Sequence, residues 1–285
     1  MKLVNGYKLL DYAKKNSIVL PCFNTTNYEL TYGIIKGIQN SNRGGYIQIS
    51  SSNLELSGPD IIAQMVKFAM DRLDVDVPIA LHLDHGTSFD DVKKCVDAGF
   101  TSIMVDASHL SFEDNIKEVK KVVDYCHYFN IPVEAELGAI QGKEESEITN
   151  SSNSKTDPDK AKEFVEKTGC DLLAVSVGNV HGLDMKPNLD FDLLRKIADI
   201  VDVPLVLHGG SGIPYKDIAR AKESNLIKIN YGSDLRKEFI STFGKQYEKN
   251  NNSFDVKTLS KQAIEKIANK VIEISDNINT GSMVD

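Results

Sequence analysis

Short apolar runs alternate with longer segments of helical periodicity along most of the chain. Eight of these runs read as buried strands: Ile18–Asn24, Gly45–Ser51, Pro78–Asp84, Ser102–Asp106, Pro132–Leu137, Leu172–Gly178, Pro204–Leu207 and Ile227–Asn230. Strands that alternate with helices form βαβ crossovers and a parallel sheet. Eight such units predict an α/β fold, a closed (β/α)8 TIM barrel, whose active site lies at the carboxyl ends of the strands.

Helical periodicity separates the expected strands, most clearly at Asp60–Leu73, Phe112–Phe129, Lys160–Thr168 and Phe191–Ile200. An extra N-terminal helix around Tyr7–Ser17 precedes the first strand. Another helix, near Val256–Ile274, follows the eighth strand within a C-terminal helical tail at about 250–285. We expect residues 1–285 to form a single barrel domain, a size that α/β barrels often reach. A doubly wound open sheet is the alternative, but no G-x-G-x-x-G motif follows the first strand.

One polar stretch, residues 139–156, interrupts this regular pattern. It is rich in Glu, Ser and Asn, and its central part, Gln141–Ser146, contains Glu144. Long loops inside a compact domain are usually functional lids or disordered. We therefore expect a mobile loop that acts as a lid over the active site.

Charge and composition narrow the classes of partner. The chain has 285 residues, 33 of them basic and 41 acidic, and a net charge of −8. This balance argues against a nucleic-acid surface and against an anionic membrane as the main partner. No apolar run approaches the roughly 20 residues of a membrane span, and the N-terminus lacks the apolar core of a signal peptide. The four cysteines have no C-x-x-C spacing, so we expect a cytoplasmic protein with free thiols.

Three of the six histidines, His85, His181 and His208, follow the third, sixth and seventh strands, and each stands beside a glycine. The ends of these strands converge over the opening of a barrel, so three neutral imidazoles can face one point and leave a fourth position open, as at catalytic zinc. For any single one of them, the alternative is a loop histidine that only makes hydrogen bonds. His82 is expected in the core or behind the ligands, because strand alternation turns it away from His85. The sequence therefore indicates one catalytic Zn²⁺ per subunit.

Carboxylates stand near this expected metal site. Asp84 precedes His85 and suits a general acid/base, although a carboxylate that only orients a ligand histidine is the alternative. Asp106 and Glu134, at the fourth and fifth strands, are candidates for another metal position or for holding the ligand histidines. Glu144 can act as a base if the polar stretch closes over the site, and solvated loop charge is its alternative.

Two glycine-rich turns follow the seventh and eighth strands. The first contains Gly209, Gly210 and Ser211, and the second contains Gly232 and Ser233. In barrels, the loops after these two strands usually bind phosphate through backbone N–H groups and hydroxyls. The turns therefore indicate a phosphate site.

Over essentially the whole chain, these residues resemble the class II, metal-dependent ketose-bisphosphate aldolases, which include fructose- and tagatose-bisphosphate aldolases. The resemblance rests on five stretches: His82–Gly86, Asp97–His109, Val133–Gly138, Gly178–Gly182 and Leu205–Gly212. It implies that Asp84 is the proton donor and that His85, His181 and His208 hold the zinc. Glu144 then matches a mobile-loop glutamate proposed to move the substrate proton.

The resemblance also implies a set of substrate-binding residues, in which we include Asn24 at the end of the first strand. The set is Asn24, Ser50, Gly182, Gly209, Gly210, Ser211, Asn230, Tyr231, Gly232, Ser233 and Arg236. Ser50 matches a phosphate-contacting serine, and Arg236 matches an arginine that binds the second phosphate. A monovalent cation, Na⁺ or K⁺, is a further candidate ligand. Family members are commonly homodimers or homotetramers.

The reaction implied is reversible aldol cleavage of a ketose 1,6-bisphosphate, first of all fructose 1,6-bisphosphate, to dihydroxyacetone phosphate and glyceraldehyde 3-phosphate. A tagatose-bisphosphate or other phospho-ketose aldolase is the alternative. Where some fructose-bisphosphate enzymes have a carboxylate after the eighth strand, this chain has Gly232, while Arg236 is present. We therefore expect a preference for bisphosphates and weak discrimination between fructose and tagatose.

Two other classes of function are kept as alternatives. A class I aldolase would form a lysine Schiff base, but Lys228, the only strand lysine available, stands near the start of its strand, on the stability face. A barrel that only senses a sugar phosphate or zinc is the other class. Asp84 beside three histidines argues against a sensor, and a turnover assay separates the two.

Overall fold

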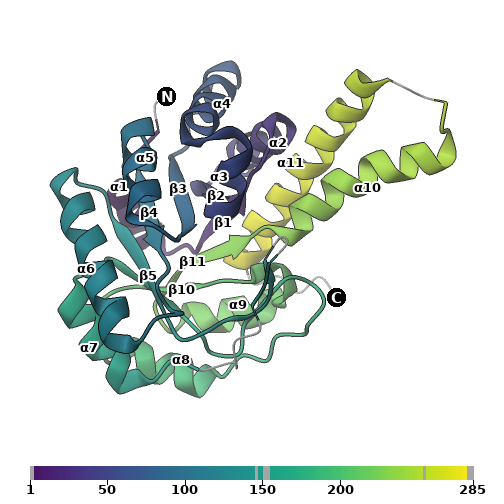
Figure 1. Ribbon diagram of the computed structural model, residues 1–285. Coiled ribbons are helices and arrows are strands. Elements are labelled where there is room, and N and C mark those ends of the chain that lie inside the picture. Colours follow the sequence, from purple (N-terminus) through teal and green to yellow (C-terminus); the bar gives the residue numbers. More distant parts are fainter. Residues whose placement is uncertain (1–2, 145–146, 150–154, 253–254, 281–285) are drawn as a thin grey trace.

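Eight parallel strands close into a barrel in a computed structural model that describes residues 3–144, 147–149, 155–252 and 255–280, with the backbone alone at 141–144 and 147–149. Around the barrel the order is β1-β11-β10-β8-β5-β4-β3-β2 (Figure 1). The bounds are β1 (Leu20–Asn24), β2 (Gly45–Ser50), β3 (Ile79–Gly86), β4 (Ser102–Val105), β5 (Val133–Leu137), β8 (Leu172–Val175), β10 (Leu205–Leu207) and β11 (Leu226–Tyr231). Every strand expected from the sequence is present, which confirms the (β/α)8 barrel.

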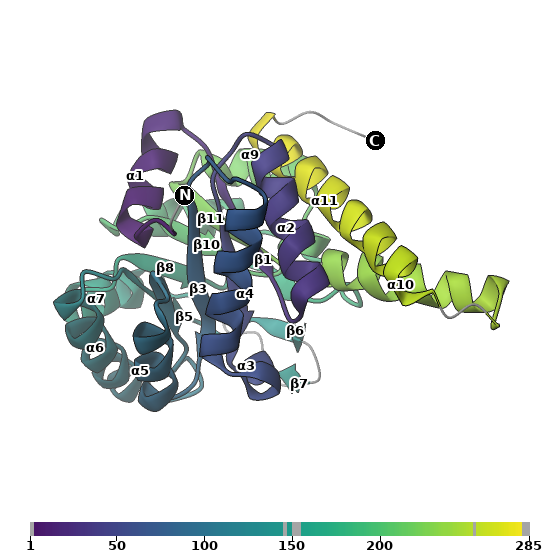
Figure 2. The ribbon, with the colours of Figure 1, turned by 90° about the horizontal axis from the view of Figure 1, so that it is seen from above.

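Helices surround the barrel and cover the outer face of its strands (Figure 2). They are α1 (Gly6–Asn16), α2 (Tyr28–Asn40), α3 (Ser51–Ser57), α4 (Pro59–Arg72), α5 (Phe89–Ala98), α6 (Phe112–Tyr128), α7 (Pro158–Thr168), α8 (Phe191–Ala198), α9 (Tyr215–Lys222), α10 (Ser233–Lys249) and α11 (Val256–Thr280). The main hydrophobic core lies between the two layers, where Ile47 and Leu81 of the strands meet Ile34 and Val66 of the helices. Within the described residues, no helix has the apolar length needed to cross a membrane.

The expected N-terminal helix, α1, closes the amino-terminal end of the barrel. Its residues Leu9, Leu10 and Ala13 are buried in a second apolar cluster with Tyr46 and Ala80, which stand near the starts of β2 and β3. This cluster fills the lower part of the barrel. Polar side chains in the interior are therefore concentrated toward the carboxyl ends of the strands.

The polar stretch expected as a long loop contains a small sheet. Strands β6 (Gln141–Glu144) and β7 (Glu147–Thr149) pair antiparallel, and β6 also pairs in parallel with β9 (Val180–His181). The expectation of a loop was wrong for these described residues, because the partner strand β9 comes much later in the chain and local sequence does not show it. Residues 145–146 and 150–154 of the expected lid lie outside the described residues, and its mobility stays a prediction.

The C-terminal part of the chain forms two long helices, α10 and α11, whose joined ends project beyond the barrel (Figures 1 and 2). Near the barrel, Ile267 and Val271 of α11 pack on α2. A Cβ atom on Gly33 would lie 2.8 Å from Ile267 Cγ2, and one on Gly37 would lie 2.5 Å from Val271 Cβ, so glycine permits this close approach. The expected tail is therefore a helix that covers the barrel as far as Thr280, and positions 281–285 lie outside the described residues.

Candidate active site

Three histidines from different strands meet at the carboxyl end of the barrel. His85 is the next-to-last residue of β3 and has a left-handed backbone φ of 46°, His181 lies in β9, and His208 follows β10. One ring nitrogen from each lies within 4.8 Å of the other two. The Nε2 of His85 and the Nδ1 of His208 are 2.9 Å apart. The structure thus brings together the three histidines that the sequence singled out.

Carboxylates hold two of these rings from the far side. The Nδ1 of His85 lies 2.7 Å from Asp106 Oδ2, and the Nε2 of His208 lies 2.9 Å from Glu134 Oε1. A carboxylate on one ring nitrogen orients the other as a ligand, which is the usual arrangement around protein-bound zinc. The donor set of three imidazoles fits Zn²⁺ with an open fourth position. A second group with metal-ligand spacing consists of His85, Asp106 and Glu136.

Glu134 is fully buried and is paired with Lys228 of β11. The Lys228 Nζ lies 2.9 Å from Glu134 Oε2. Burial alone would raise the pKa of Glu134, but Lys228 and the bond from His208 lower it below its ordinary value. Burial also opposes the charge of Lys228, yet the carboxylates of Glu134 and Asp84 raise its pKa. A protonated amine has no lone pair to form a Schiff base, so the class I alternative gains no support.

Asp84, next to His85 in β3, is fully buried and held by three side-chain amides. Asn24 and Gln48 donate to its Oδ2 at 2.8 and 3.0 Å, and Asn230 donates to its Oδ1 at 3.1 Å. The same Oδ1 is 4.0 Å from the Nε2 of His85. The carboxylate is therefore fixed within reach of a group bound at the histidines. Sequence reasoning missed Gln48, although a buried amide in the apolar strand β2 was a signal.

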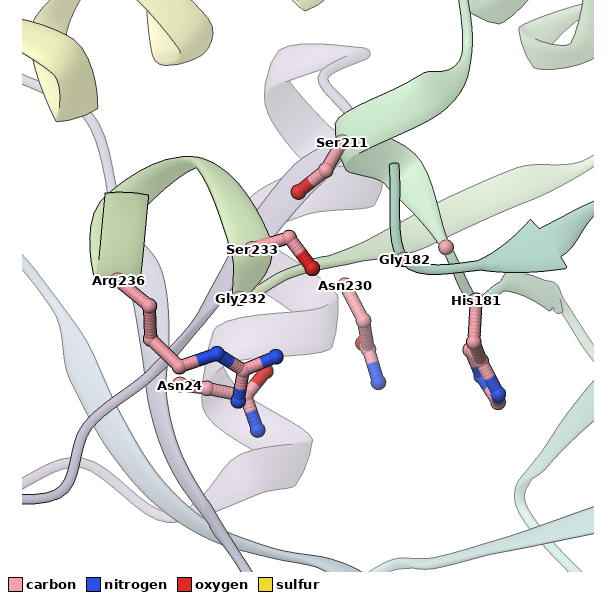
Figure 3. Close-up of a pocket in the computed structure, with 9 residues that line it drawn as sticks. Asn24, His181, Gly182, Ser211, Asn230, Gly232, Ser233 and Arg236 are labelled. Carbon is pink, nitrogen blue, oxygen red and sulfur yellow. The ribbon is translucent and has the colours of Figure 1, made fainter. Parts of the chain in front are cut away.

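A pocket of about 330 Å³ opens beside His181 (Figure 3). Its lining consists of Asn24, His181, Gly182, Gly209, Ser211, Asn230, Gly232, Ser233 and Arg236. Except for His181, all of these were expected to bind substrate. Among these residues only Arg236 carries a full charge, and its guanidinium lies beside the amide of Asn24. Helix α10 begins at Ser233, so its positive N-terminal end also lies at this pocket. The pocket therefore suits an anionic group.

A close approach of two backbones shapes one wall of the pocket. Gly209 has a φ of +73°, and a Cβ atom there would lie 1.9 Å from the carbonyl oxygen of Val180. Only glycine fits both the left-handed conformation and this contact. The contact places the turn that follows His208 directly against β9, which carries His181.

The chain matches the family described as "Fructose-bisphosphate aldolase class-II" over residues 4–282. It belongs to this family. Similar proteins include the fructose-bisphosphate aldolase of Staphylococcus aureus, 41% identical over 236 residues, or 82% of each chain. That of Geobacillus stearothermophilus is 36% identical over 257 residues, 90% of this chain and 89% of the relative. Among solved structures, the YdjI aldolase of Escherichia coli K12 has a TM-score of 0.83 at 30% identity, with 97% of both chains covered.

One expected substrate residue of this class II aldolase has its side chain elsewhere. Tyr231 is buried in the outer hydrophobic core, and its ring centroid lies 6.0 Å from that of Phe23. Because Lys228 and Asn230 face the barrel interior, strand alternation turns Tyr231 outward. Its side chain therefore does not line the pocket, and contact of Tyr231 with substrate stays a prediction.

Gly210 and Ser50 also lie outside the pocket lining of the aldolase. A Cβ atom on Gly210 would lie 2.7 Å from the carbonyl oxygen of Asn230, so this glycine packs behind the pocket. Ser50 ends β2 in register with Asp84 of β3, and its Oγ accepts from Asn53 Nδ2 at 3.1 Å. Contact of either residue with substrate stays a prediction.

The remaining candidate residues of the aldolase are one glutamate, Glu144, and three histidines, His82, His109 and His127. Glu144 belongs to β6, and its side chain lies outside what the structure describes, so its catalytic role stays a prediction. His82 is fully buried inside the barrel, with its Nδ1 2.8 Å from Ser102 Oγ, as expected for a core histidine. His109 is exposed after β4, and His127 lies on α6.

Proposed function

We propose that this protein catalyses the reversible, zinc-dependent aldol cleavage of a ketose 1,6-bisphosphate, first of all fructose 1,6-bisphosphate. The products are dihydroxyacetone phosphate and glyceraldehyde 3-phosphate. The observation that supports this most is the position of Asp84 beside His85, His181 and His208, next to an anion-binding pocket that contains Arg236. The family and the names of both relatives support the same reaction.

Three imidazoles, those of His85, His181 and His208, would hold one Zn²⁺ per subunit. Bound zinc supplies Lewis-acid polarisation of the ketose carbonyl. Asp106 and Glu134 keep two of the rings oriented through their outer nitrogens, so that the ligand lone pairs converge without rearrangement.

Asp84 would move the proton of the C4 hydroxyl. As the C3–C4 bond breaks, this hydroxyl becomes the aldehyde oxygen and must lose its proton to a base, and the same group returns the proton in the direction of synthesis. The amides of Asn24, Gln48 and Asn230 prevent the carboxylate from rotating away. Its burial supports this role, because water is excluded from the proton transfer.

The pocket would bind the phosphates of the substrate. Backbone N–H groups at the start of α10 and the hydroxyls of Ser211 and Ser233 suit the phosphate of the dihydroxyacetone half, with Gly182 allowing close approach. Arg236 would bind the second phosphate as a charged, bidentate donor. Both assignments place positive partial or full charge at the anion.

Three finer assignments rest on the resemblance to the family. Glu144 would serve as the base of the mobile loop, and Ser50 would contact a phosphate from the end of β2. A monovalent cation, Na⁺ or K⁺, would bind as a further ligand.

We also propose that residues 1–285 work as one barrel domain in a cytoplasmic homodimer or homotetramer. On the projecting helix α10, Ile240 and Tyr247 are each 67% exposed, and apolar side chains of this kind are often covered in oligomers. The cysteines are free and buried, which agrees with a reducing compartment.

Removal of the metal tests the proposed function. A chelator should abolish cleavage of fructose 1,6-bisphosphate, and added Zn²⁺ should restore it, as measured by release of triose phosphate. Borohydride with substrate should leave the activity intact, because no imine is formed. Cleavage that persists without metal, or that borohydride destroys, would rule out this mechanism.

A tagatose-bisphosphate aldolase is the second candidate, and Gly232 supports keeping it. We expect kcat/KM for fructose and tagatose 1,6-bisphosphates to agree within about tenfold, or about 1.4 kcal/mol. A ketose monophosphate measured in parallel reports the contribution of the second phosphate. A ratio between the two bisphosphates above about a thousand, some 4 kcal/mol, would show that other residues read the epimer.

A further inference from the structure

Lys228 is a buried cation that the proposed reaction does not use. Its side chain is 1% exposed, inside the barrel beneath the histidines. Its Nζ donates to Asn230 Oδ1 at 2.7 Å and lies 2.9 Å from Glu134 Oε2. Replacing a buried ion pair by apolar residues is often neutral or stabilising. Stability alone is therefore a poor explanation for this lysine.

Two of the acceptors of Lys228, Glu134 and Asn230, lead to different parts of the site. Glu134 continues to the Nε2 of His208 at 2.9 Å, on the side of the zinc ligands. Asn230 continues through its Nδ2 to Asp84 Oδ1 at 3.1 Å, on the side of the proton carrier. Lys228 can therefore affect zinc binding, through Glu134 and His208, or proton transfer, through Asn230 and Asp84. A loss of zinc reports the first effect, and a loss of kcat with zinc still bound reports the second.

The ammonium determines which way round the Asn230 amide is placed. A lysine ammonium has three donors and no acceptor, so the amide atom that faces it must be Oδ1. The Nδ2 group then faces Asp84 and can donate to it. Turned by half a rotation, the amide would present its oxygen to the carboxylate and its NH₂ group to the ammonium, and both contacts would be repulsive.

The other amides at Asp84 are oriented by neutral groups. The Nε2 of Gln48 donates to Asn24 Oδ1 at 2.7 Å, which leaves the Asn24 Nδ2 to face Asp84. The thiol of Cys22 in turn donates to Gln48 Oε1. Each of the three amides is thus fixed by a donor behind it, and only for Asn230 is that donor a full charge.

We propose that Lys228 is a positioning residue, which holds the Asn230 amide in the orientation that donates to Asp84. This inference rests on the proposed role of Asp84 in proton transfer. Without the ammonium, the Asn230 amide is held on one side only and can rotate away from the carboxylate, so Asp84 is no longer fixed at the reacting hydroxyl. The substrate pocket, which Lys228 does not line, should keep most of its affinity.

Lys228→Met tests the inference because it removes the charge and keeps an unbranched side chain. With saturating Zn²⁺, kcat should fall by about 10- to 100-fold, part of the roughly 10²–10⁴ that a positioned acid/base contributes. KM should change by less than about threefold. Zinc content should stay at one ion per subunit. Unchanged kcat, or loss of zinc in proportion to activity, would overturn the inference, since the second result assigns Lys228 to the route through Glu134.

A double-mutant cycle separates orientation of the amide from a general structural effect. In an Asn230→Ala background, Lys228→Met should lower kcat by less than about threefold further, because the amide that it orients is gone. Equal factors in both backgrounds would overturn the proposal. Met104→Leu is the matched control, a buried change in the barrel interior outside this network, and should leave kcat within about twofold.

A second variant covers the case in which Lys228→Met does not fold. Lys228→Met combined with Glu134→Gln removes both charges of the buried pair, which such sites often tolerate. Its zinc content should stay at one ion per subunit while its kcat stays low, because the Asn230 amide is still not held. Recovery of wild-type kcat would show that Lys228 only balances Glu134, and would overturn the inference. Wild-type protein that fails to cleave with zinc would instead contradict the proposed function.

Discussion

Two consecutive residues, Asp84 and His85, reach the same site although they are neighbours on a strand. Strand alternation would turn their side chains to opposite faces. The left-handed φ of 46° at His85 breaks this alternation and turns its ring toward His208. Non-glycine residues in this region of backbone space are uncommon and cluster at functional sites. The unusual backbone conformation of His85 therefore supports the two different roles proposed above, metal binding for His85 and proton transfer for Asp84.

Substitution distinguishes those tasks. Asp84→Ala should keep its zinc and lower kcat by about 10²–10⁴, the usual contribution of a positioned acid/base. His208→Ala should lose the metal, because two imidazoles bind Zn²⁺ more weakly than three. Metal content should be measured beside turnover for both variants. Stoichiometric loss of zinc from Asp84→Ala would instead make Asp84 a residue that orients a ligand.

Gly232 is a second position where one side chain changes the expected chemistry. A Cβ atom there would lie 3.1 Å from both Arg236 Nη2 and Asn24 Oδ1. A carboxylate in Gly232→Asp would therefore pair with Arg236 and compete with a phosphate. We expect KM for fructose 1,6-bisphosphate to rise by about tenfold relative to a ketose monophosphate, a loss of about 1.4 kcal/mol.

Gly232→Ala is the matched control for that prediction, because it adds the Cβ atom without the charge. It should change the ratio of the two KM values by less than about threefold. If Gly232→Asp leaves the ratio unchanged while Arg236→Ala raises it, the added carboxylate does not pair with the arginine.

The sequence predicted some residues of this site and missed others. The residues that it missed depend on contacts between strands and on the direction of a side chain. The three clustered histidines and Asp84 were visible because they stand where apolar strands end. Gln48 was missed because its amide acts across two strands on Asp84, a contact that no local pattern shows. The outward direction of the Tyr231 side chain was not predicted, because a turn motif says nothing about the face to which a strand points its last residue.

At the level of helices and strands, the contact between α2 and α11 is the feature that the sequence did not show. Gly37→Ala should destabilise the protein by about 1–3 kcal/mol, because the new Cβ would lie 2.5 Å from Val271 Cβ. The free energy of unfolding in urea measures this. Gly244→Ala on α10 is the control, since nothing lies within 4 Å of its Cβ position, and it should stabilise by about 0.5–1 kcal/mol.

A second substitution, at Val271, tests whether the close contact with position 37 causes this loss of stability. Val271→Ala should cost less in the Gly37→Ala background than in the wild type, because it removes Val271 Cγ1, which the new Cβ would meet at 2.6 Å, and leaves only the contact with Val271 Cβ on that side chain. Additive costs would show that the two residues do not meet.

Elements defined by local pattern were predictable, and those defined by distant partners were not. The eight barrel strands follow from apolar runs that need no knowledge of the rest of the chain. Strand β6 exists through its pairing with β9, and α11 acquires its place through glycines on α2. Each of these depends on two segments far apart in sequence. A polar stretch and a tail were the only signals available locally.

At the scale of the whole molecule, the chain is acidic, yet the groups that line its pocket suit an anion. The net charge is −8, yet the pocket gathers Arg236, the start of α10 and turn backbone without a carboxylate in its lining. Two carboxylates of the barrel interior, Asp84 and Glu134, lie instead behind amides, Lys228 and histidines. The site thus separates the proposed phosphate region from the proposed metal and proton-transfer region.

The buried interior also predicts how stability depends on pH. Burial lowers the pKa of His82 well below its ordinary value, Lys228 lowers it further, and Glu134 opposes them. In the unfolded chain a histidine titrates near pH 6.5. Between these two values the unfolded state binds a proton that the folded state does not, so stability must fall as the pH falls below about 6.5.

His82→Gln removes this proton and should flatten the dependence. With metal-free protein in both cases, the wild type should lose up to about 1.4 kcal/mol of unfolding free energy per pH unit more than the variant between about pH 6.5 and about pH 5.5. Above about pH 7.5 the two curves should run parallel, because His82 is neutral in both states there. His85, His181 and His208 are present in both proteins, and the charges of His85 and His208 enter the difference only because they lower the pKa of His82 further. Equal slopes below pH 6.5 would mean that the barrel interior accepts a charged His82, and that the pair of Glu134 and Lys228 does not exclude a further cation.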